Sequence, residues 1–174
     1  GAILYARAEN ADVISMSFGG PDEGGMAAFM QDLMDFANAA NIVCVAAAGN
    51  SDTNEMFFPA ACQGVISVGA TDENNQRASF STYGPWVDIA APGNRIWSTI
   101  CQNYSFSYLD GLLYMLLMDW DGSNPYMMSD GTSMACPLVA GVCGLIRNQS
   151  PGMPPAEVLE RLLSTGDAVT FDQP

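Results

Sequence analysis

A serine at position 133 lies where an apolar helix is predicted to start, in the stretch MSDGTSMACPLVAGVCGLI that covers residues 128–146. Gly131 permits a close approach of the backbone, and Thr132 and Ser133 are residue types that cap helices. The free amides and positive dipole end of such a helix also stabilise negative charge beside the serine. The local pattern therefore allows two interpretations, a helix cap or a nucleophile.

A catalytic Ser133 needs a base, because a serine hydroxyl is a weak nucleophile until its proton is removed. The chain contains no histidine. The order serine, acid, histidine of the α/β-hydrolases requires a histidine after the serine, so this order is excluded. The order aspartate, histidine, serine places both partners before the serine. A catalytic Ser133 is then expected to have its aspartate and histidine upstream of residue 1.

Asn50 is the second candidate for chemistry. It directly follows the continuous apolar run IVCVAAAG at residues 42–49, which has the length of a buried strand. An asparagine at this place is an ordinary turn residue. Its side-chain amide is also the kind of donor that stabilises an oxyanion in acyl transfer.

The elements that must position these residues alternate between apolar runs of strand length and segments with helical spacing. The predicted strands cover residues 13–17, 42–49, 65–71 and 87–93, and the predicted helices cover residues 2–9, 26–40, 132–148 and 155–164. Strands that are apolar on both faces and alternate with helices indicate an α/β fold, a doubly wound, mostly parallel sheet with helices on both faces. Functional groups in such sheets gather beyond the carboxyl ends of the strands. This rule directs attention to residues 17–20 and 48–50.

One segment does not fit this alternation. Residues 101–130 hold aromatic residues, methionines and aspartates without clear periodicity, and we interpret them as a long surface insertion.

Composition narrows the possible partners. The chain of 174 residues has 49% hydrophobic residues and a formal net charge of −14. This negative charge argues against nucleic acid and anionic membrane surfaces as partners. No apolar run is long enough to cross a bilayer, and no signal peptide is visible.

The five cysteines, at positions 44, 62, 101, 136 and 143, form no CxxC pair. Without histidine they make a zinc site improbable, and we expect buried free thiols. A disulfide between Cys62 and Cys101 is an open alternative.

Six blocks of this sequence resemble the C-terminal part of the catalytic domain of subtilisin-like serine peptidases, the subtilases. In chain order they are ADVISMSFGG, VAAAGN, FFPA, VISVGATDENNQRASFSTYG, VDIAAPG and DGTSMACPLVAGV. The resemblance implies a serine endopeptidase that acts on polypeptide substrates, in which residues 1–174 form an N-terminally truncated part of the catalytic domain. The missing N-terminal part would supply the catalytic aspartate and histidine, so the fragment alone is expected to be inactive.

The resemblance also implies roles for individual residues. Ser133 matches the nucleophile, and Asn50 matches the asparagine of the oxyanion hole, with the Ser133 backbone amide as second donor. Ser17, Phe18 and Gly19 match a substrate-lining strand, and Ala47, Ala48 and Gly49 match a wall of the specificity pocket. The alternative is a non-catalytic subtilase-like binding or structural domain. Retention of both Ser133 and Asn50 favours the peptidase, because a binding module needs neither.

The chain also departs from the family pattern. Leu138 stands where a histidine outside the triad is usual, and Cys136 stands where serine or threonine is usual. Some subtilases hold a weak cation site where this chain has residues 60–65 and Asp88, and a weak structural calcium there is the alternative to no cofactor. We expect no cofactor and interpret Asp88 as a solvated or hydrogen-bonded residue. Secretion is implied by the resemblance alone.

Overall fold

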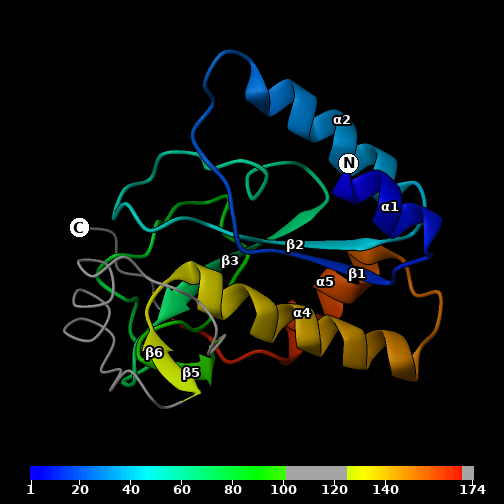
Figure 1. Ribbon diagram of the computed structural model, residues 1–174. Coiled ribbons are helices and arrows are strands. Elements are labelled where there is room, and N and C mark those ends of the chain that lie inside the picture. The colour runs from blue at the N-terminus through cyan, green and yellow to red at the C-terminus, as the bar shows by residue number, and fades with distance from the viewer. Residues whose placement is uncertain (101–124, 170–174) are drawn as a thin grey trace.

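The computed structural model describes residues 1–100 and 125–169. A parallel sheet of four strands, in the order β1-β2-β3-β4, forms its centre (Figure 1). The strands are β1 (Val13–Met16), β2 (Val43–Ala47), β3 (Val65–Thr71) and β4 (Ile89–Pro92). The sheet and the helices around it confirm the α/β fold predicted from the alternation of apolar runs and helical segments.

Helices cover both faces of this sheet (Figure 1). Helices α1 (Ala2–Ala8) and α2 (Met26–Asn38) lie on one side, and α4 (Thr132–Gln149) and α5 (Pro155–Thr165) lie on the other. Alternate residues of β2 enter the two resulting cores: Val43 and Val45 pack with α4 and α5, whereas Cys44 and Ala46 pack with α2. Because every residue of β2 is buried, its sequence is a continuous apolar run.

Two short strands were not among the predicted elements. β5 (Ile96–Thr99) and β6 (Tyr126–Ser129) pair in antiparallel fashion. β6 lies inside the segment 101–130 that the sequence indicates as an insertion, so the last part of that segment belongs to a regular element. Residues 101–124 lie outside the described part of the chain.

The carboxyl ends of the parallel strands meet at one edge of the sheet, where α4 begins. Ser17 follows β1, Asn50 lies three residues after β2, and Gly93 follows β4. The carbonyl oxygen of Gly93 accepts a hydrogen bond of 2.8 Å from the Gly131 amide. A Cβ atom at Gly93 would lie 2.8 Å from the Gly131 carbonyl oxygen and 3.4 Å from the Ala135 Cβ. Glycine at position 93 therefore allows the close approach that brings the start of α4 to this edge.

Among the described helices, none combines the length and the apolar character that a membrane span requires.

Candidate active site

The first turn of α4 places the Ser133 side chain at the carboxyl edge of the sheet. The helix begins at Thr132, and its N-cap is Gly131, with a φ of 145° and no side-chain capping bond. Ser133 is the second residue of the helix, and neither Thr132 nor Ser133 acts as a cap. The cap interpretation of Ser133 is therefore wrong, because the capping position falls on a residue without a side chain.

Asn50 performs the capping function from a different loop. Its Oδ1 accepts a hydrogen bond of 2.8 Å from the Thr132 amide and one of 2.9 Å from the Thr132 hydroxyl. The Thr132 Oγ1 in turn accepts a hydrogen bond of 3.1 Å from the Gly49 amide. Thr132 is fully buried. This network fixes the loop after β2 against the first turn of α4.

The same network orients the Asn50 amide group. A backbone N–H can only donate, so the side-chain oxygen of Asn50 must face Thr132 and the Nδ2 must point elsewhere. A Cβ atom built at Gly131 would lie 3.2 Å from Asn50 Nδ2 and 3.6 Å from the Ser133 backbone nitrogen. Two hydrogen-bond donors thus border one small space beside Gly131. In the described part of the chain neither donor has a hydrogen-bond partner.

Ser133 and Ser17 form a reciprocal pair across this edge. The Ser133 hydroxyl donates a hydrogen bond of 3.2 Å to the Ser17 carbonyl oxygen. The Ser17 hydroxyl donates one of 2.8 Å to the Ser133 carbonyl oxygen. A carbonyl oxygen cannot remove a proton from serine at neutral pH, so the hydroxyl is positioned by this contact without being activated.

The two segments predicted to line the substrate flank this pair. Ser17, Phe18 and Gly19 are exposed, and the Phe18 side chain is 60% exposed. Ala47 and Ala48 are buried, with exposed fractions of 3% and 0%. After β2 the side chains of Ala47 and Ala48 therefore belong to the core. Gly49, whose φ is 110°, connects them to Asn50.

The role of Thr132 was not predicted from the sequence. Nothing in the local pattern distinguishes it from an ordinary capping residue, because its partners lie more than 80 positions upstream.

A family model described as the subtilase family matches residues 1–173. The chain belongs to the subtilase family.

Individual subtilases match most of this chain. Subtilisin DY of Bacillus licheniformis is 40% identical over 167 residues, which cover 94% of the chain and 52% of the relative. Thermitase of Thermoactinomyces vulgaris is 35% identical, with 97% of the chain and 51% of the relative covered. A solved structure of proteases from Pseudoalteromonas arctica has a TM-score of 0.74 and 33% identity, and it covers 91% of the chain and 45% of that structure. The chain thus spans about half the length of these subtilases.

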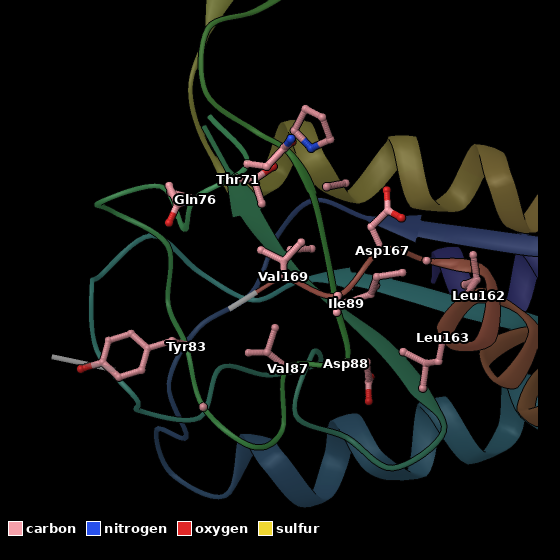
Figure 2. Close-up of a pocket in the computed structure, with 17 residues that line it drawn as sticks. Thr71, Gln76, Tyr83, Val87, Asp88, Ile89, Leu162, Leu163, Asp167 and Val169 are labelled. Atoms are coloured by element: carbon pink, nitrogen blue, oxygen red, sulfur yellow. The ribbon is translucent and has the colours of Figure 1, made fainter. Parts of the chain in front are cut away.

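The subtilase chain also has a cavity of about 1100 Å³ at the outer edge of the sheet (Figure 2). It lies between β4, α5 and residues 166–169, and neither Ser133 nor Asn50 lines it. Asp88 lies at this cavity, where its Oδ2 accepts a hydrogen bond of 2.8 Å from the Ser67 amide. The Asp88 side chain as a whole is exposed, yet desolvation of its carboxyl raises the pKa of that group. Asp88 is thus the hydrogen-bonded residue that we expected, and the cavity is separate from the serine.

The four cysteines in the described part of this subtilase chain are buried, as predicted. Cys44, Cys62, Cys136 and Cys143 are free thiols, whereas Cys101 lies outside the described residues. Within residues 1–100 and 125–169, no three of the side chains suited to metal binding gather into one group.

Proposed function

We propose that the full protein is a serine endopeptidase that hydrolyses polypeptide substrates through an acyl-enzyme on Ser133. The observation that carries this proposal is the space beside Gly131, which Asn50 Nδ2 and the Ser133 amide border together. Donors fixed in advance around one point are what acyl transfer requires, because negative charge develops there on the carbonyl oxygen. Membership of the subtilase family supports the same reaction.

In the proposed reaction the Ser133 Oγ attacks the carbonyl carbon of the scissile peptide bond. The carbonyl oxygen becomes an oxyanion and accepts hydrogen bonds from Asn50 Nδ2 and from the Ser133 amide. The proton of the hydroxyl passes to a base, which then delivers it to the leaving amine. Water hydrolyses the resulting ester and releases the second product.

The base and the residue that orients it are proposed to come from an upstream part of the same catalytic domain. Two surfaces of the described chain are suited to receive that part. β1 lies at the edge of the sheet, with its second edge unpaired in the described part. On α4, the large apolar side chains of Leu138, Val142 and Leu145 are 45%, 44% and 65% exposed. They share one helical face, which an adjoining part of the domain would bury.

The substrate is proposed to bind as an extended strand along residues 17–19, beside the loop after β2. Backbone hydrogen bonds hold a peptide in this mode, while alternate side chains enter pockets. The chemistry requires no cofactor, since the serine, the two donors and the upstream base supply every step. Export from the cytoplasm is proposed from family membership alone.

The proposal is tested with the natural coding sequence extended upstream of residue 1. We expect the full protein to hydrolyse peptides and to react with a fluorophosphonate at Ser133, and Ser133→Ala to abolish both. Residues 1–174 alone should label slowly or not at all, because the hydroxyl lacks a base. A full protein that binds peptides, but neither cleaves them nor labels at Ser133, would instead be the non-catalytic subtilase-like module.

A further inference from the structure

The position of the attacked carbonyl defines where the neighbouring substrate side chain must go. In the proposed reaction the carbonyl carbon would lie against Ser133 Oγ, which contacts the Ser17 carbonyl oxygen, and its oxygen would lie next to Asn50 Nδ2. Asn50 directly follows Gly49. The residue that supplies the carbonyl, here called the acyl residue, is therefore flanked by residues 17–19 on one side and residues 47–49 on the other. Its side chain would then extend into the space between these two segments.

The ring of Phe57 lies in that space. A Cβ atom at Gly19 would be 2.8 Å from Phe57 Cδ1 and 2.8 Å from Phe57 Cε1, whereas a Cβ atom at Gly49 would be 3.2 Å from Cγ and 3.3 Å from Cδ2. Cδ1 and Cδ2 are on opposite edges of a phenyl ring. One edge thus contacts Gly19 and the other contacts Gly49, and the ring spans the distance between the two glycines.

The backbone holds this ring in place. Phe58 and Gly20 exchange two hydrogen bonds, of 2.7 Å and 3.0 Å, in an isolated antiparallel bridge. The Phe57 carbonyl oxygen accepts a further hydrogen bond of 2.8 Å from the Ala61 amide. The backbones of Phe57 and Phe58 are thus fixed, and that of Phe58 is fixed to the segment that the ring contacts. A substrate side chain would have to displace a ring whose backbone is fixed by three hydrogen bonds.

We infer that Phe57 sets the substrate preference: its ring occupies the space for a large acyl side chain, so the enzyme cleaves after small residues such as glycine, alanine and serine. This inference rests on the proposed function and adds the class of substrate to it. The Phe57 ring occupies the place that an aromatic side chain of the substrate would take. Two aromatic rings cannot occupy that place together, since protein interiors leave no room of that size.

The test compares peptide nitroanilides that differ solely in the acyl residue, with the full protein as enzyme. For the wild type we expect kcat/KM to be on the order of 100-fold higher for alanine than for phenylalanine, because even one excess methylene costs about 10- to 200-fold. Phe57→Ala should raise kcat/KM for phenylalanine and leucine substrates by at least about 10-fold. Phe80→Ala is the matched control: Phe80 packs against the α4 side of the core and should leave the preference unchanged.

The possible outcomes separate this inference from the proposed function. Hydrolysis with a wild-type preference for leucine or phenylalanine would overturn the role of Phe57 and leave the peptidase intact. The absence of hydrolysis with every substrate would overturn both. If Phe57→Ala does not fold, Phe57→Leu, which keeps the residue apolar, should still widen the preference. A wild-type preference for leucine or phenylalanine contradicts the inference even without a variant.

Discussion

Asn50 uses the two ends of its amide for different purposes, and two substitutions separate them. Asn50→Ala removes the acceptor of two hydrogen bonds from Thr132 as well as the free Nδ2 donor. Asn50→Asp keeps an acceptor oxygen for Thr132 and replaces the Nδ2 donor by a second, negatively charged acceptor. The pair therefore distinguishes the structural part of the side chain from the part proposed to act on the oxyanion.

The magnitudes follow from the contacts. Each of the two lost hydrogen bonds contributes about 1 kcal/mol, and both donors belong to a buried residue, so Asn50→Ala should lower the free energy of unfolding by at least about 2 kcal/mol. Asn50→Asp should stay within about 1 kcal/mol of the wild type, since a carboxylate near a helix N-terminus is favourable. Both should lower kcat by roughly 100- to 1000-fold, a range established for an oxyanion donor of a subtilisin rather than worked out from this geometry.

Stability is best measured by urea denaturation of the full protein in a Ser133→Ala background, which prevents self-digestion, and activity is measured with Ser133 present. If Asn50→Asp and Asn50→Ala lower the free energy of unfolding equally, the hydrogen bonds from Thr132 to Asn50 Oδ1 do not stabilise the fold. If Asn50→Asp retains wild-type kcat, Nδ2 is not a donor to the transition state, and the space beside Gly131 does not bind the oxyanion.

Three further predictions concern other parts of the molecule. Gly131→Ala should reduce kcat/KM at least as strongly as Asn50→Ala, because its methyl group would lie 3.2 Å from Asn50 Nδ2 at a φ of 145°; steady-state kinetics that match the wild type would contradict this. Burial raises the pKa of Cys44 from 9.0 to about 12 and that of Cys143 to about 11, so the native state keeps protons that the unfolded state releases. The free energy of unfolding should therefore fall as pH rises from about 9 towards 11 and 12, and denaturation at pH 8 and pH 10 measures it, with Cys44→Ala expected to weaken the dependence. Leu145→Glu, on the exposed face of α4, should prevent the full protein from reaching its active fold, because the charge would be buried against the upstream part; an active, stable variant would show that this face stays in solvent.

The strands of the sheet were predictable from the sequence because each of them is a local apolar run, whereas their order was not predicted. β2 and β3 are buried on both faces, and each is visible as an apolar run bounded by polar residues. The start of α4 at Thr132 was predictable for a similar reason, since Gly131 directly precedes a run of apolar and small residues. β5 and β6 were missed, because four residues each carry little signal and the strands are paired across more than 25 positions.

The site was less predictable than the fold. Family resemblance indicated Ser133 and Asn50, yet the hydrogen bonds between Asn50 and Thr132 join residues 82 positions apart. Such a contact depends on how the loop after β2 meets α4, and no local pattern reports it. Phe57 is similar: the block FFPA is visible in the sequence, whereas the direction of the ring depends on the bridge between Phe58 and Gly20.

The network from Gly49 through Thr132 to Asn50 has a consequence for how the chemistry is distributed along the gene. The proposed nucleophile, Ser133, and the proposed oxyanion donors all lie within residues 50–133, whereas proton transfer is proposed to depend on residues encoded earlier. A full protein whose upstream base has been replaced would then keep the two proposed oxyanion donors, Asn50 Nδ2 and the Ser133 amide. In a subtilisin without its triad, the residual rate remains on the order of 1000- to 10000-fold above that of water. If these proposed roles hold, proton transfer and charge stabilisation can change independently in evolution, because separate stretches of the chain encode them.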